Sequence, residues 1–314
     1  MKRSTSSPIR LRDFVRDSND WIYSVTAYDN DETVGCLLRY IPNENGERVD
    51  PSGNRYRKIP FEEAYEIIAR VHPSYVGLMH RIPQTDIAGV YKPDCVVGAL
   101  AEHDTQVRRL SDLFSGLAFG VTGSRLVGLG SSDSDIDGVV YGSDFHAAQV
   151  RLKEGIRQGI VSDLSDELWE AVYKKRDPEL SYDEFFVHEA RKWNRGQIDE
   201  TYFDLLYVRS YAEMMNYHVP VGWKGEIQEI EAVVTDDRYA YDSPAIYLVN
   251  HAEYDAVVSF THTYSGQALT GERIEARGVT ETHVDGTRWL VIGSTRAAKG
   301  EYIRSLTLLE SFQS

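Results

Sequence analysis

The chain has 314 residues, of which 42% are hydrophobic and 26% charged, and its formal net charge at pH 7 is −15. This composition is that of an ordinary globular protein, and the length suits about two or three domains. The acidic charge argues against a simple nucleic-acid-binding protein, because those proteins carry a basic surface. Two explanations of the charge stay open: adaptation to a salty cytoplasm, or a nucleotide or small-molecule substrate that needs only a local basic patch.

The sequence carries no mark of a membrane or secreted protein. No apolar run approaches the ~18–20 residues that span a bilayer. The basic residues among positions 1–10 are followed by no apolar stretch, so we expect no secretion signal. Cys36 and Cys95 are too few for a disulfide framework or a zinc quartet. We therefore expect a cytoplasmic protein with no membrane partner.

The first part of the chain is predicted to be rich in β-structure. Four segments with many β-branched and aromatic residues predict strands: 21–28, 34–41, 47–49 and 55–59. A helix is predicted over 60–71, because glutamates occupy its first turn and apolar residues follow at helical spacing. The proline-interrupted segment 73–100 is predicted to be a linker.

In the central part of the chain the hydrophobic pattern becomes helical. Amphipathic patterns predict helices over 104–115, 125–129, 145–155, 162–173 and 182–195. Short buried strands are predicted over 118–122, 136–141 and 202–208. The mixture predicts a mixed sheet backed by helices.

The last part of the chain returns to a β-pattern. Strands are predicted over 227–235, 245–250, 256–261, 273–277 and 289–294. Asp285-Gly286 predicts a hairpin turn. Five short strands around glycine turns fit a small barrel, and an OB-like barrel is one such arrangement.

These elements together predict an α+β fold. The central domain, 96–215, would hold the mixed sheet and its helices. A β-rich domain with one helix, 1–95, and a β-barrel-like domain, 216–314, would flank it.

Gly123 and Ser124 follow the strand predicted over 118–122. A glycine directly after a buried strand allows a sharp turn and a close approach to a ligand. Its N–H and that of Ser124, at the start of the predicted helix 125–129, form an anion nest that suits a terminal phosphate. The Ser124 hydroxyl adds another donor.

Asp135 and Asp137 stand two residues apart at the next predicted strand, so their side chains point to one face. Carboxylates this close repel each other unless a divalent cation lies between them, and their hard oxygens suit Mg²⁺. Two Mg²⁺ ions would activate an attacking hydroxyl and stabilise departing pyrophosphate. Asp204 is the candidate for the third carboxylate, because a charge inside the apolar strand 202–208 is costly without a ligand. The alternative is an edge-strand aspartate that faces water.

Cations are needed to neutralise a bound triphosphate. Arg125 directly follows Ser124, and Lys192 and Arg195 precede the strand that carries Asp204. All three are candidates for binding the phosphates. Ordinary surface charge is the alternative for each of them.

The order of these parts resembles the signature of the DNA polymerase β-type nucleotidyltransferase superfamily, which is Gly-Ser, a spacer and Asp-x-Asp on the adjoining strand. Gly123, Ser124, Asp135 and Asp137 match it position by position, and Asp204 matches the third carboxylate by context. The three-part chain also resembles a group of archaeal predicted nucleotidyltransferases. This wider likeness rests on residues 37–42, 55–58 and 191–196.

The resemblance implies Mg²⁺-dependent transfer of a nucleoside monophosphate from an NTP, such as ATP, to a hydroxyl acceptor. RNA, a protein or a small molecule could be that acceptor. Two other functions stay open: a non-catalytic nucleotide- or RNA-binding module that uses the outer β-rich domains, and a regulator that transfers AMP to another protein.

Overall fold

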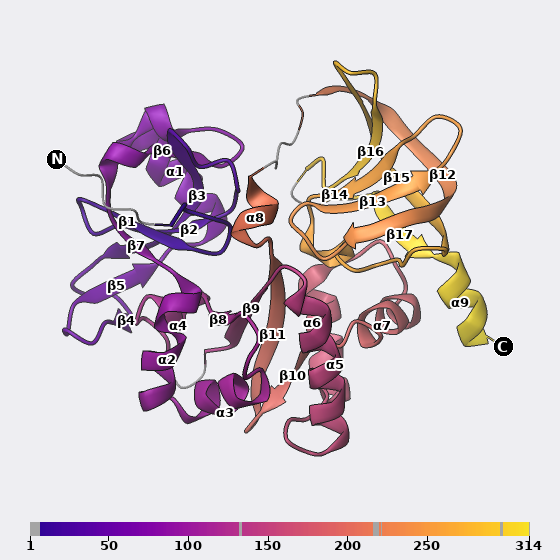
Figure 1. The fold of residues 1–314 in the computed structure, drawn as a ribbon. Coiled ribbons are helices and arrows are strands. Elements are labelled where there is room, and N and C mark those ends of the chain that lie inside the picture. Colours follow the sequence, from indigo (N-terminus) through magenta and orange to yellow (C-terminus); the bar gives the residue numbers. More distant parts are fainter. Residues whose placement is uncertain (1–6, 132–133, 216–219, 221, 296–297, 314) are drawn as a thin grey trace. The chain divides into compact units, whose positions relative to one another are not determined.

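A computed structural model of the chain describes residues 7–131, 134–215, 220, 222–295 and 298–313. The chain forms two compact units (Figure 1). Unit 1 contains Met1–Ser162 and Gly196–His218, and unit 2 contains Asp163–Arg195 and Val219–Ser314. Both combine helices and sheets, so the predicted α+β class is confirmed. The three domains predicted from the sequence differ from these two units, because both units are discontinuous in the chain.

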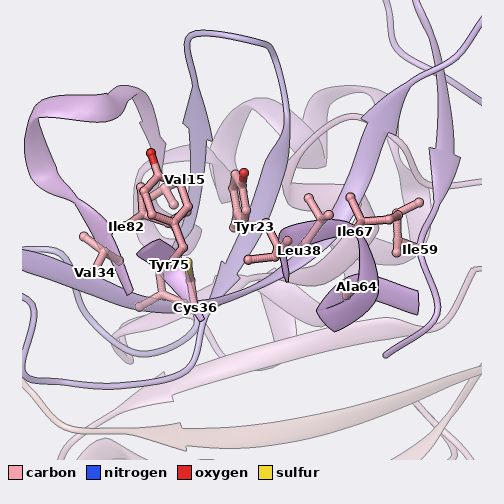
Figure 2. Packing of buried hydrophobic residues seen from close by; sticks show 12 residues of the cluster. Val15, Tyr23, Val34, Cys36, Leu38, Ile59, Ala64, Ile67, Tyr75 and Ile82 are labelled. Atoms are coloured by element: carbon pink, nitrogen blue, oxygen red, sulfur yellow. The ribbon is translucent and has the colours of Figure 1, made fainter. Parts of the chain in front are cut away.

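The N-terminal part of unit 1 is a seven-stranded sheet with the order β4-β5-β3-β2-β1-β7, in which β6 also pairs with β3. Its strands are β1 (Phe14–Asp17), β2 (Ile22–Val25), β3 (Thr33–Pro42), β4 (Arg48–Val49), β5 (Arg55–Lys58), β6 (His80–Pro83) and β7 (Ile87–Tyr91). Helix α1 (Phe61–Val71) lies where the sequence predicted a helix, and it buries Ala64, Ile67 and Ile68. Figure 2 shows Ala64 and Ile67 of α1 packed with residues of β1, β2 and β3 such as Val15, Tyr23 and Leu38.

The predicted linker 73–100 is wrong, because this segment is largely structured. It contains the 3-10 turns η1 (Pro73–Tyr75) and η2 (Gln84–Asp86), strands β6 and β7, and most of helix α2 (Pro93–His103). Strand β6 pairs with β3, and β7 pairs with β1, both far away in sequence. These strands are only four and five residues long, so long-range pairing rather than a local pattern decides that they form.

The other sheet of unit 1 has four strands in the order β10-β11-β9-β8. They are β8 (Phe119–Val121), β9 (Ile136–Tyr141), β10 (Arg195–Ile198) and β11 (Thr201–Val208). Strand β8 runs antiparallel to β9, and β11 runs parallel to β9. The remaining helices of unit 1 are α3 (Thr105–Leu113), α4 (Gly123–Leu126), α5 (Asp144–Arg157) and α8 (Tyr211–Met214).

One apolar cluster joins the N-terminal sheet to the segment that follows β8. Phe14, Ile22, Tyr40 and Tyr56 of the N-terminal sheet pack with residues of α4 and the loop after it: Leu126, Val127 and Leu129. The N-terminal sheet therefore packs directly against the segment that carries Gly123 and Ser124, which explains why residues 1–95 do not form a separate unit.

Unit 2 combines α-helices with a six-stranded sheet. The helices are α6 (Asp166–Arg176) and α7 (Tyr182–Ala190), and α9 (Leu306–Gln313) follows the last strand. The strands are β12 (Gly222–Tyr239), β13 (Ala245–Asn250), β14 (Ala256–Ser259), β15 (Arg273–His283), β16 (Arg288–Ile292) and β17 (Tyr302–Ser305), with the turn η3 (His262–Tyr264) between β14 and β15. The order is β12-β13-β14-β16-β15-β17, and an additional β12–β15 pairing closes five strands into a ring. Gly286 turns between β15 and β16 with φ 87°.

Helices α6 and α7 belong to the barrel unit because their ends bond to its strands and loops. The N–H of Glu179 donates to the Tyr264 hydroxyl at 3.0 Å, and the N–H of Ser305 donates to His188 Nε2 at 2.8 Å. These contacts assign the segment 163–195 to unit 2, whereas the sequence analysis placed it in the central domain. Across the described ranges, no helix is both long and apolar enough to cross a bilayer.

Candidate active site around Gly123 and Asp137

Gly123 lies directly beside Asp137. The N–H of Thr122, directly after β8, donates to the carbonyl oxygen of Asp137 on β9 at 2.9 Å. Gly123 has φ 72°, and a Cβ atom built on it would lie 2.0 Å from Asp137 Oδ2. Both the backbone conformation and the lack of space therefore require glycine here. The sequence predicted that the backbone at Gly123 approaches a ligand closely; in the structure this backbone approaches the Asp137 carboxylate.

Asp137 and Asp204 are neighbours on parallel strands. The register of β9 and β11 pairs Asp137 with Asp204, so both side chains leave the sheet on the same face. Each is half-buried. The structure thus brings the proposed third carboxylate beside the second.

The pair is electrostatically strained. Burial and the Asp204 charge, with a smaller effect from Asp135, raise the pKa of Asp137 to about 7, although Arg12 and Arg39 oppose the shift. A carboxyl group with this pKa is half protonated near neutral pH, because a second negative charge beside it is costly. A perturbation of this kind is typical of functional sites.

The donor set of this pair fits a divalent cation. Two carboxylates on one face of a sheet repel each other, and binding of Mg²⁺, which prefers such hard oxygen ligands, relieves this repulsion. Asp135 is exposed and precedes β9. Within the described residues, which omit 132–133 of this loop, no group of three or more His, Cys, Asp or Glu side chains is arranged to hold a metal ion. Asp135 therefore remains a predicted ligand, whereas the structure places Asp137 and Asp204 together.

Arg125 differs from its predicted role. Its buried guanidinium forms an ion pair with Asp104, the residue before α3, and donates to the carbonyl of Ser134 at 2.7 Å. A Cβ on Gly130 would lie 3.0 Å from its side chain. Arg125 therefore fixes the loop between the glycine turn and β9. The sequence alone did not predict this ion pair, because Asp104 lies 21 residues before Arg125.

Lys192 and Arg195 also differ from their predicted role. Both are buried in unit 2, whereas Gly123 and Asp137 lie in unit 1. Lys192 forms an ion pair with the buried Glu189, and Arg195 contacts the other oxygen of the same carboxylate at 2.5 Å. Burial would raise the pKa of Glu189, but the charges of Arg195 and Lys192 outweigh it and lower that pKa to about 2. The two cations balance an internal carboxylate.

Three arginines near the candidate site were missed by the sequence analysis. Arg12 and Arg39 act on Asp137 electrostatically, and Arg48 bonds to the loop that precedes it. All three belong to the N-terminal β-rich segment. No local pattern separates the three from the other arginines of this segment.

Replacing Gly123 with Ala is expected to disturb the site more than the fold. Alanine at this positive φ costs about 1–2 kcal/mol, and displacing the Asp137 carboxylate by about 1 Å costs roughly 10²-fold in rate. Gly53→Ala is the matched control, since Gly53 has φ 87° but a Cβ there would meet nothing within 4 Å. Thermal unfolding of both variants, together with their rates in the nucleotidyl transfer expected from the sequence, separates strain from the clash. Equal losses in the two variants would contradict the proposed packing of Gly123 on Asp137.

Comparison with known proteins finds one strong relative. The chain is 34% identical to the uncharacterized protein MJ1086 of Methanocaldococcus jannaschii, in an alignment of 335 positions that covers 94% of this chain and 98% of the relative. No protein-family model and no solved structure matches the chain. The coverage is almost complete on both sides, so the likeness extends over both units. The chain therefore belongs to the same family as this archaeal protein.

Proposed function

We propose that the chain is a Mg²⁺-dependent nucleotidyltransferase, which moves a nucleoside monophosphate from an NTP to a hydroxyl acceptor and releases pyrophosphate. One observation carries the proposal: Asp137 and Asp204 stand in register on parallel strands, and Asp137 packs on Gly123 of the Gly-Ser turn. Gly123, Asp137 and Asp204, which follow one another as a pattern in the sequence, are neighbours in the folded chain.

The chain's own residues have separate tasks in this reaction. Asp137 and Asp204, with Asp135 at the start of the strand, would hold Mg²⁺. When bound, this ion lowers the pKa of the acceptor hydroxyl and shields charge on the departing pyrophosphate. The acceptor oxygen forms a bond to the α-phosphorus, the bond from that phosphorus to the bridging oxygen breaks, and the hydroxyl proton passes to Asp204. The N–H groups at Gly123 and Ser124 would bind phosphate oxygens, and the Ser124 hydroxyl bonds to no other described side chain or backbone group.

The strand pairings of unit 2 favour an OB-like barrel, because β12 pairs with both β13 and β15, and β14 runs parallel to β16. Its groove of about 570 Å³ does not favour RNA. Glu226, Glu229 and Glu253 line it, and its Arg288 is paired with Glu253 at 3.0 Å. Carboxylates repel a phosphate backbone. We therefore favour the enzyme over a module that binds RNA through this barrel.

Label transfer tests the proposal directly. The chain is incubated with Mg²⁺ and NTPs labelled at the α-phosphate, together with cellular RNA, protein and metabolite fractions. Asp204→Asn is expected to slow transfer about 10²-fold, since about 3 kcal/mol of the stabilisation of the transition state is lost. Asp199→Asn is the control, because Asp199 lies in the turn before β11 and pairs with Arg109 on the surface.

The fraction that accepts label identifies the acceptor class, and label on protein would select the AMP-transferring regulator. Transfer at the wild-type rate by Asp204→Asn would exclude Asp204 as a metal ligand. If the wild-type chain bound no NTP and labelled no fraction, the enzyme proposal would be refuted.

A further inference from the structure

The loop that joins Gly123 to Asp137 is contacted by the N-terminal sheet of unit 1. Arg48, on β4, donates from Nη1 to the Ser134 hydroxyl at 3.2 Å and to the Ser131 hydroxyl at 3.3 Å. The same nitrogen approaches the carbonyl of Leu129 at 3.4 Å. Arg48 is thus fixed on this loop, and its contact Ser134 directly precedes Asp135 and stands three residues before Asp137.

Arg39 approaches the same site from a β-bulge. On β3, Tyr40 pairs with Ile22 and Leu38 pairs with Tyr23, so Arg39 between them has no partner in the register with β2. The bulge sends Leu38 into one apolar core and Tyr40 into the other. Bulges re-aim side chains and are common beside active sites. Arg39 is half-buried, and its guanidinium makes no hydrogen bond or ion pair with a described residue.

Arg12 approaches from the turn before β1. Its backbone has φ 71°, in the left-handed region that non-glycine residues rarely adopt. Its carbonyl accepts a hydrogen bond from the Thr122 hydroxyl at 2.6 Å, so the residue before Gly123 holds this turn in place. The Nε of Arg12 is buried and bonds to no other atom among the described residues. Strain held in this way clusters at functional sites.

Backbone and packing contacts bring both arginines to the Gly123 turn. Thr122, which bonds to the carbonyl of Arg12, directly precedes Gly123, and Tyr40, next to Arg39, packs on Leu126 and Leu129 after that turn. Neither guanidinium is within ion-pair distance of a carboxylate among the residues described. Their donors are therefore left for a ligand that lies between them and the carboxylates. A planar guanidinium matches the oxygens of a phosphate in bidentate fashion.

We propose that Arg12 and Arg39, with Arg48 holding the loop, form the polyphosphate-binding wall of the site and receive the β- and γ-phosphates of the NTP. The proposal rests on the proposed function and deepens it. The triphosphate is then neutralised by arginines of the N-terminal β-rich segment instead of by Lys192 and Arg195. That sheet is therefore a part of the nucleotide site rather than a separate binding domain.

Binding of inorganic triphosphate, measured by calorimetry with and without Mg²⁺, tests the wall without needing an acceptor. Arg39→Gln is expected to weaken binding at least about tenfold, because one charge-assisted bidentate contact is lost, and Arg39→Lys should lose less. Arg12→Asn is expected to weaken binding similarly, since asparagine tolerates the left-handed backbone. Arg81→Gln is the control, because Arg81 lies on β6 of the same sheet and pairs with Asp29 at 2.9 Å.

The outcomes separate this proposal from the proposed function. Wild-type affinity for triphosphate in Arg39→Gln and Arg12→Asn would overturn the wall, even if the wild-type chain transfers label. Absence of triphosphate binding by the wild-type chain would also overturn it. Arginine-dependent binding without any label transfer would support the wall and refute the catalytic proposal. Thermal unfolding of each variant checks that a loss of affinity does not come from a loss of the fold.

Discussion

Asp137→Asn is expected to slow the proposed nucleotidyl transfer by several orders of magnitude while making the folded chain more stable above neutral pH. Asp137 would hold Mg²⁺ and packs on the Gly123 turn, so its loss should slow transfer about 10³–10⁴-fold, more than the loss of Asp204. The stabilisation follows from removing one of two repelling charges. Because the side chain is half-buried and partly screened, we expect about 1–2 kcal/mol at pH 8.

The pH dependence of this difference has a definite sign. Burial and Asp204 raise the pKa of Asp137 from 3.8 to about 7 in the folded chain. Between these values the folded chain holds a proton that the unfolded chain has released, so the free energy of unfolding falls as the pH rises through this window. Asparagine does not titrate. The stability difference between variant and wild type should therefore be small near pH 4 and reach its maximum above pH 7.

Thermal unfolding of both proteins from pH 4 to pH 8.5 measures this difference. At pH 8, added Mg²⁺ should raise the melting temperature of the wild type, because an ion that binds only the folded state stabilises it, by about 2.7 kcal/mol at a hundred times its Kd. The variant should show no such rise. A variant that is destabilised at pH 8, or that still responds to Mg²⁺, would contradict the proposed site.

Glu189→Gln is expected to destabilise the chain by about 3–5 kcal/mol, because it leaves Lys192 and Arg195 buried without their shared counter-charge. Burial already lowers the pKa of Lys192 to about 8, against the opposing effect of Glu189. Glu170→Gln is the control: Glu170 lies on α6 and pairs with Lys174 at 3.0 Å on the surface, so its loss should cost at most about 1 kcal/mol. Chemical denaturation measures both.

A second variant distinguishes the structural role of this triad from the triphosphate contact predicted by the sequence. Replacing all three residues with apolar ones, Glu189→Leu with Lys192→Met and Arg195→Leu, removes both signs of charge together, which buried ion clusters tolerate. We expect this variant to fold and to bind ATP with Mg²⁺ as the wild type does. A clear loss of ATP affinity in a folded triple variant would restore Lys192 and Arg195 as phosphate ligands.

How far the sequence predicted this molecule depends on the range of the interactions involved. The neighbourhood of Gly123 and Asp137 was predictable because a strand, a glycine turn and alternate aspartates are local features. Asp204 was predictable because one charge inside an apolar strand is conspicuous. The strand β9 and the helix α1 lie where local periodicity placed them.

The remainder depended on partners distant in the chain. Arg12 and Arg39 are ordinary arginines until the bulge in β3 and the turn before β1 bring them to Asp137. Lys192 sits between aromatic and polar residues that resemble a surface, yet Glu189 and Gln267 surround its ammonium group. Local pattern could not show either, because burial and charge pairing are set by the folded chain as a whole.

The interleaving of the two units has a consequence for synthesis on the ribosome. The chain leaves unit 1 at Ser162 and returns at Gly196, and the bridge between Ser162 and Gln197 closes that excursion with hydrogen bonds of 2.9 and 2.8 Å. The sheet of unit 1 lacks Asp204 until β11 has emerged. Meanwhile α6 and α7, already translated, lack the strands of the barrel that cover them. Neither unit can be completed in simple order from the N-terminus, so the nascent chain carries an uncovered helix pair until residues 219–314 are made.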